Sequence, residues 1–77
     1  MSDKLTFRYD READILTIEK CVPYAEQESE ELTPEVVARS NPTTGDIEGV
    51  EVLFFSTRMQ TDGSFELPIT ADLRRAS

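Results

Sequence analysis

The sequence predicts a mainly β to α+β domain: a small antiparallel sheet of two hairpins, with about four to five strands and at most one short helical segment near the C-terminus. Two observations favour this fold class. Short runs alternate apolar with polar residues, and clusters of turn-forming residues separate those runs. The chain has 77 residues and is predicted to form a single small domain, 1–77, since a compact unit needs about 50 residues or more.

The first hairpin is predicted from two alternating runs. Leu5, Phe7 and Tyr9 alternate with polar residues, so their side chains lie on one face of a strand. Residues 15–19 continue the alternation with β-branched side chains, and the mostly polar residues 10–14 favour a turn. The two runs are therefore expected to pair as an antiparallel hairpin.

The expected turn has three alternating acids, Asp10, Glu12 and Asp14, as does the start of a calcium-binding loop. The rest of that motif is missing, because Ile15 stands at its glycine position and Cys21 at the position of its closing acid. We therefore expect a hairpin turn in which Asp10 or Asp14 accepts hydrogen bonds from nearby backbone N–H groups. Weak divalent-cation binding is the alternative.

A strongly acidic segment follows, from Ala25 to Glu35. Pro23 ends the first hairpin, because proline has no N–H to donate to a strand ladder. Like charges at this density disfavour an isolated helix and favour a solvated connector or an edge strand. The acids of this segment are Glu26, Glu28, Glu30, Glu31 and Glu35.

The segment after these acids allows two interpretations. Thr33 and Pro34 suit a helix start, as a cap and a first-turn proline. The Asn-Pro pair at 41–42 would end that helix after about two turns, which is short. We favour a strand over Val36–Ser40 that enters a second hairpin through the turn residues 41–46.

The most apolar segment is Ile47–Phe55. Val50, Val52 and Phe54 are expected to face one way, and the intervening residues, including Phe55, the other. Apolar side chains on both faces indicate a central strand, or a strand whose second face meets a partner.

The C-terminal part is predicted in three pieces. Residues 56–60 suit a short turn or helical piece, and residues 61–64 another turn. Phe65, Leu67 and Ile69 alternate around a proline, which fits an edge strand or an extended tail. Residues 70–75 are expected to close the chain with a helical turn.

One stretch resembles a known family. Residues 7–18 resemble the opening signature of the bacterial family domain of unknown function 2283, which reads approximately as tyrosine-aspartate-x-glutamate-alanine-aspartate followed by an apolar strand. Ser29–Leu32 and Gly49–Leu53 also agree. The resemblance covers about residues 4–58 and leaves a C-terminal extension of about 59–77. It implies a compact antiparallel domain with a short helical element and no established activity. It also implies that some members act as antitoxin-like or accessory partners of neighbouring proteins.

The residue types exclude several chemistries. Without histidine, neither a Ser-His-Asp nor a Cys-His arrangement can form within the chain. Cys21 is the only cysteine, which excludes an internal disulfide and a Cys/His zinc site, and we expect it to be a half-buried small hydrophobic residue. The protein is therefore predicted not to be an enzyme, with no catalytic residues, no metal site and no cofactor.

The charge balance restricts the partners. Sixteen acids against eight bases leave a net charge of −8, and the bases are scattered. Binding to nucleic acid or to an anionic membrane is disfavoured, because both need clustered cations. A basic protein is the natural complement. One cysteine and no apparent targeting segment favour the cytoplasm.

The leading hypothesis is a non-enzymatic protein-interaction module, an antitoxin-like or accessory partner of a basic protein. Two alternatives remain open: a self-assembling structural homodimer that buries the Phe55 side of its strand, and a small-ligand or weak divalent-cation binder. The candidate partner-binding residues are Glu26, Glu28, Glu30, Glu31, Phe54 and Phe55.

Overall fold

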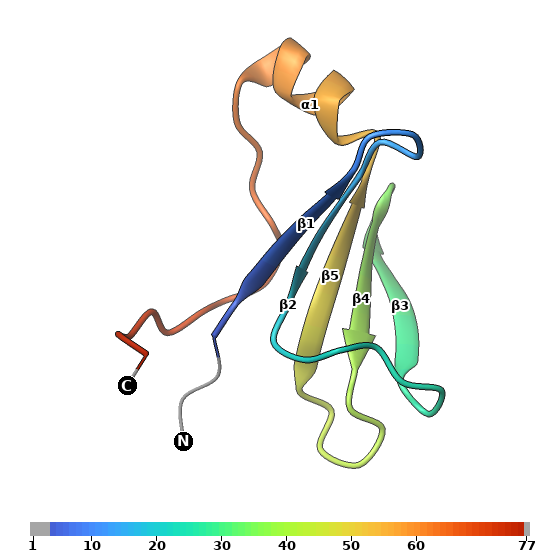
Figure 1. The fold of residues 1–77 in the computed structure, drawn as a ribbon, viewed down its shortest axis with the longest axis vertical. Coiled ribbons are helices and arrows are strands. Elements are labelled where there is room, and N and C mark those ends of the chain that lie inside the picture. The colour runs from blue at the N-terminus through green and yellow to red at the C-terminus, as the bar shows by residue number, and fades with distance from the viewer. Residues whose placement is uncertain (1–3, 77) are drawn as a thin grey trace.

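The computed structural model describes residues 4–76 and shows one five-stranded antiparallel sheet followed by a short helix (Figure 1). The strand order is β1-β2-β5-β4-β3, so β5 lies in the middle and β1 and β3 form the two edges. The elements are β1 (Thr6–Asp10), β2 (Ile15–Glu19), β3 (Glu28–Thr33), β4 (Val36–Ser40), β5 (Ile47–Leu53) and α1 (Phe55–Asp62).

This architecture confirms the predicted fold class. The first hairpin is β1–β2, and β5 is the central strand that its apolar composition predicted. Of the two interpretations of the acidic segment, the edge strand is the one observed, as β3. The strand over Val36–Ser40 is also confirmed, because Val36 and Ala38 pack inward while a turn at Glu35, with φ 70°, separates β4 from β3.

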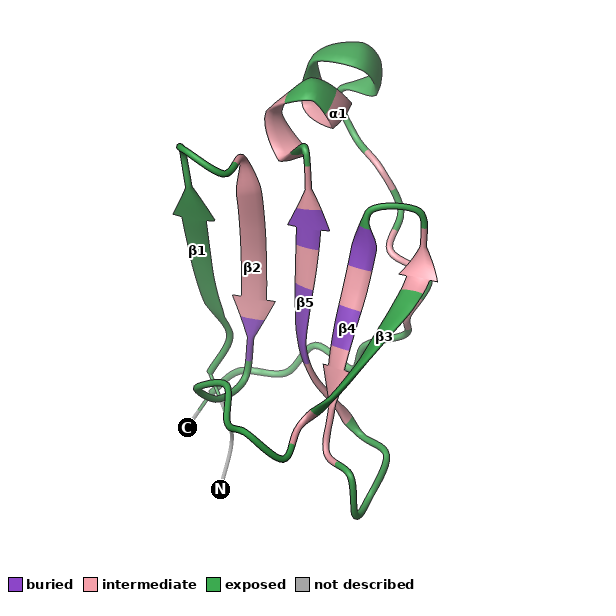
Figure 2. Ribbon diagram, turned by 90° about the vertical axis from the view of Figure 1, so that its right-hand side faces the viewer, coloured by how far each residue is buried: buried purple, intermediate pink, exposed green. Residues whose placement is uncertain are grey.

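The two faces of the sheet differ in chemistry. One, the apolar face, contains the buried core residues Val36, Ala38, Val50 and Val52, which the register places side by side on β4 and β5. The buried residues of these two strands stand out in Figure 2. The other, the polar face, contains two ion pairs between neighbouring strands: Arg8–Glu19 and Arg39–Glu51, each at 2.6 Å.

The chain turns sharply where β5 ends. Phe54 has a left-handed backbone (φ 54°), and this reversal ends the strand at Leu53, two residues before the expected end at Phe55. Phe55, not Phe54, therefore packs against the buried valines, while Phe54 is 52% exposed. The expected assignment of these two phenylalanines to faces was wrong, because β5 stops at Leu53.

The helix and tail correct two further expectations. α1 runs to Asp62, beyond the expected residues 56–60, and Gly63 (φ 72°) closes it by donating its N–H to the Met59 carbonyl at 2.8 Å. Residues 64–76 form an extended tail, so the helical turn expected at 70–75 was wrong. Those residues are exposed, and one exposed turn cannot offset the cost of helix nucleation.

The tail covers the apolar face. Phe65, Leu67 and Ile69 pack against the core cluster, together with the half-buried Leu16 and Phe55. Of the two interpretations of this alternating segment, the extended tail is the one observed, and its three apolar side chains pack against the sheet. Figure 1 shows the tail crossing beside the sheet on the side where α1 lies.

Cys21 also departs from expectation, since it is exposed in the segment after β2. The chain is already leaving the sheet there, so the alternation no longer places side chains toward the core. As for membranes, no helix in the described part of the chain is long and apolar enough to span a bilayer.

Candidate functional site

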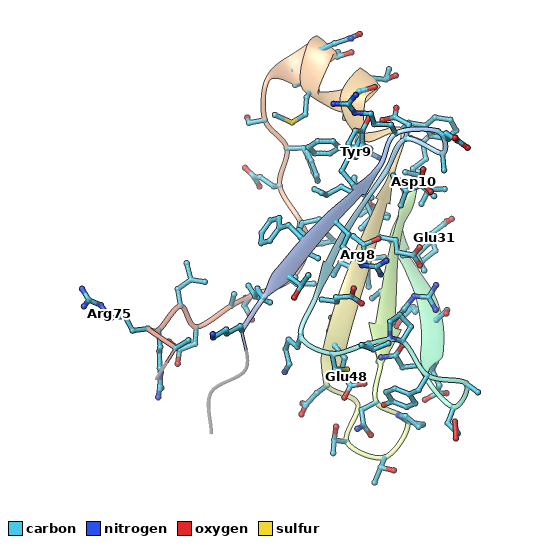
Figure 3. All side chains as sticks on the ribbon, viewed as in Figure 1. Arg8, Tyr9, Asp10, Glu31, Glu48 and Arg75 are labelled. Atoms are coloured by element: carbon cyan, nitrogen blue, oxygen red, sulfur yellow. The ribbon has the colours of Figure 1, made fainter. Side chains whose placement is uncertain are left out.

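The acidic edge, defined as Glu26, Glu28, Glu30 and Glu31, follows the outermost strand of the sheet. Glu28, Glu30 and Glu31 lie on β3, opposite Ser40, Ala38 and Val37 of β4. All four glutamates are exposed, and within residues 4–76 none of them forms an ion pair. Figure 3 shows the labelled Glu31 at this margin of the molecule.

The acidic edge differs from the carboxylates nearer the centre of the sheet. Glu19 on β2 and Glu51 on β5 are each held by an arginine on a neighbouring strand. The edge therefore carries uncompensated negative charge beside the backbone groups that β3 does not use for pairing with β4. This combination suits a positively charged partner and opposes pairing with a second acidic strand.

The structure does not unite all the predicted site residues. The four glutamates belong to β3 and the loop before it, whereas Phe54 and Phe55 follow the far end of β5, two strands away. The registers place Glu28 opposite Ser40, which lies beside the start of β5. The predicted set thus divides into an acidic edge and a separate aromatic pair.

The aromatic pair has two different environments. Phe55 makes edge-to-face contacts with Tyr9 (centroids 5.8 Å apart) and Phe65 (6.2 Å), so its ring belongs to the packing between sheet, helix and tail. Phe54 is more than half exposed. Of the two, Phe54 is the ring that a partner can reach.

Two carboxylate-centred clusters were missed by sequence reasoning. In the first, Asp14 accepts hydrogen bonds from the Tyr9 hydroxyl (2.6 Å), the Ser56 hydroxyl (2.8 Å) and the Ser56 N–H (3.0 Å). The bond from Tyr9 and those from Ser56 lower the pKa of Asp14 below its usual value, and the bond to Asp14 raises the pKa of Tyr9. This cluster ties the β1–β2 turn to the start of α1.

Asp10 confirms the predicted turn chemistry. Its Oδ1 accepts hydrogen bonds from the N–H groups of Glu12 (3.0 Å) and Ala13 (3.1 Å). The three acids that resembled a calcium loop therefore belong to the β1–β2 connection: Asp10 fixes the turn, and Asp14, at φ 58°, reaches the helix. No group of three or more His, Cys, Asp and Glu residues is placed to hold a metal ion among the described residues.

The second cluster lies at the other end of the sheet, where Figure 3 labels Glu48. Glu48 accepts hydrogen bonds from the Tyr24 hydroxyl (2.6 Å), Gln27 Nε2 (3.0 Å) and Asn41 Nδ2 (3.3 Å). The bonds from Tyr24 and Gln27 lower the pKa of Glu48, and the bond to Glu48 raises the pKa of Tyr24 to about 12. The cluster anchors the loop that leads into β3, and so positions the start of the acidic edge.

These features define the class of protein: a single antiparallel sheet in which a Tyr-Asp-Ser cluster joins the first turn to α1, the helix after the last strand. The chain belongs to the family described as protein of unknown function (DUF2283), whose model matches residues 6–56. The matched part begins with β1 and ends at Ser56, so it contains the whole sheet and the Asp14–Ser56 contact. The resemblance inferred from the signature at 7–18 is thereby confirmed. No curated protein and no solved structure matches the chain.

Family membership gives the signature a structural reason. Its tyrosine and its last aspartate are Tyr9 and Asp14. The Tyr9 hydroxyl donates a hydrogen bond to Asp14, and Asp14 also accepts from Ser56, the last matched residue. Its first aspartate is Asp10, which fixes the turn. In this chain, then, residues of the signature join the β1–β2 turn to the start of α1.

Proposed function

We propose that this protein is a non-enzymatic protein-interaction module that binds a basic protein through the acidic edge, as an antitoxin-like or accessory partner. The observation that carries the proposal is the set of four exposed glutamates along an edge strand, none in an ion pair within residues 4–76. Desolvating a charge is costly unless an opposite charge replaces the water, so lysines and arginines are the matching side chains.

The edge position adds a second element of recognition. An extended segment of a partner can add to an exposed strand through main-chain hydrogen bonds, while side chains provide selectivity. On β3, alternation directs Glu28 and Glu30 toward one face and Glu31 toward the other. A basic segment lying along β3 would therefore meet carboxylates on both sides of its backbone.

The test compares two charge-matched variants in capture from the source cells at low salt, followed by binding of the purified partner. One variant is E26Q/E28Q/E30Q/E31Q. The control is E12Q/D46N/D62N/E66Q, which neutralises four exposed carboxylates elsewhere. Each variant loses four of the net eight negative charges, so a nonspecific charge effect weakens both equally.

We expect the edge variant to bind on the order of tenfold more weakly and to lose most of its salt dependence, while the control binds like the wild type. Equal binding by all three proteins, or equal loss in both variants, would contradict recognition by the acidic edge.

A further inference from the structure

The opposite edge of the sheet has different properties. β1 pairs with β2 on one side and has no neighbouring strand on the other among residues 4–76. All five of its residues are exposed, as Figure 2 shows at the margin of the sheet. Its outward backbone N–H and C=O groups are therefore open to pairing with another strand.

Three large apolar side chains line this edge. Leu5 is 50% exposed, Phe7 62% and Tyr9 43%, and alternation places all three on the apolar face. Like charges along an edge oppose its pairing with a second copy, as the glutamates of the acidic edge at β3 do. The β1 edge carries an apolar row instead.

From these features we propose that the β1 edge is a homodimer interface in which β1 pairs antiparallel with β1 of a second copy, across a two-fold axis at Phe7. Such an axis, perpendicular to the sheet, keeps each face continuous between the copies. Phe7 then lies opposite Phe7 of the second copy, and Leu5 lies opposite its Tyr9. The apolar row of each copy is covered by that of the other.

Charge selects this register. With the axis at Phe7, Lys4 lies opposite Asp10 of the second copy, an attractive pair that occurs twice by symmetry. Moving the axis to Arg8 would place the Arg8 side chains of the two copies opposite each other. Moving it to Thr6 would place Lys4 of one copy opposite Arg8 of the other. Both alternatives set like charges directly across from each other, which is destabilising.

The dimer forms one ten-stranded sheet, since each copy contributes five strands. The two acidic edges then lie at its outer ends, and the interface uses none of their residues. Self-pairing is therefore independent of the proposed binding of a basic partner, and either can fail without the other. If both hold, the dimer presents two binding edges and its affinity for a bivalent partner rises through avidity.

The first test is the mass of the wild-type protein in solution, by sedimentation and native mass analysis at high micromolar concentration. We expect twice the 8.7 kDa of the chain. Phe7→Lys places two cations opposite each other and should weaken the dimer on the order of tenfold or more. The control is Val22→Lys, at an apolar side chain that is 81% exposed outside the edge, and it should leave the mass doubled.

Cysteine cross-linking tests the register independently of any loss of folding. In a Cys21→Ser background, Phe7→Cys should form an intermolecular disulfide, because opposed residues of antiparallel strands have Cα atoms about 4.5–5.5 Å apart, within disulfide range. Thr6→Cys should not, since Thr6 lies opposite Arg8 of the second copy. Three results would each overturn the proposal. The wild-type protein could be a monomer, the folded Phe7→Lys variant could dimerise like the wild type, or cross-linking could occur at Thr6→Cys rather than at Phe7→Cys.

Discussion

The carboxylate of Asp14 lies against Ser56, accepting a hydrogen bond from its hydroxyl at 2.8 Å and another from its backbone N–H at 3.0 Å. The two residues are 42 positions apart in the chain. Phe54, at the N-cap of α1, has no side-chain acceptor for the first helical N–H groups, so Asp14 supplies from the β1–β2 turn what a local cap supplies in most helices.

Loss of the Asp14 carboxylate should therefore destabilise the fold. We expect Asp14→Asn and Asp14→Gly to lower the urea midpoint, since both residues tolerate the left-handed backbone and the variants differ chiefly in hydrogen bonding. Glu12→Ala in the same turn is the control and should leave the midpoint unchanged, because Glu12 takes part through its backbone. Equal midpoints for all four proteins would contradict the capping role.

Acid should weaken the protein through the same carboxylates. Asp14 and Glu48 have folded pKa values lowered from about 3.8 and 4.5, so their stabilisation is complete above the usual pKa range and is lost as the pH falls through the folded values. Thermal unfolding measured from neutral pH to below 4 should show this loss, and Asp14→Asn with Glu48→Gln should flatten the acid limb. If the double variant loses thermal stability as steeply as the wild type when the pH falls, other carboxylates cause the loss of stability in acid.

The tyrosines should resist ionisation. The bond to Glu48 raises the pKa of Tyr24 to about 12, so the stability linked to it is complete below pH 10 and is lost as the pH rises toward 12. Ultraviolet titration of Tyr9→Phe, which leaves Tyr24 as the only phenol, should show ionisation near 12 in the folded protein and near 10 in urea. Adding Glu48→Gln should return the pKa of Tyr24 in the folded protein toward 10. A pKa that stays near 12 in this variant would contradict the hydrogen bond to Glu48 as the cause.

The tail should contribute to stability although it lies outside the family match. Leu67 packs against the core cluster, so Leu67→Ala should cost about 1–2 kcal/mol, less than a fully buried leucine because the site is half-exposed. Leu73→Ala is the control, since that side chain is 83% exposed and its loss should change stability little. Urea unfolding of both variants measures the difference, and equal stabilities would show that the tail does not cover the sheet in solution.

Much of the local structure was predictable from the sequence. Alternation at Leu5, Phe7 and Tyr9 predicted β1, and the Asn-Pro pair at 41–42 correctly argued for a strand rather than a helix before it. The acidic edge was visible as a run of glutamates, and the family as a signature around Tyr9–Asp14. These are patterns over a few neighbouring residues, where side-chain alternation and turn propensity act directly.

The contacts that organise the molecule were not predictable in this way. Nothing near Asp14 in the chain indicates Ser56, and nothing near Glu48 indicates Tyr24. The face of Phe55 was mistaken because a single left-handed residue at Phe54 ended the alternation.

The sequence alone indicated most of the strands and turns and the charge of each segment, because these depend on backbone propensity and on the spacing of apolar residues. The tertiary structure decided that β1 and β3 are the two edges, one apolar and one acidic, and that the tail covers the apolar face. Those outcomes depend on which surfaces can be buried together, a property of the whole chain that no short segment encodes.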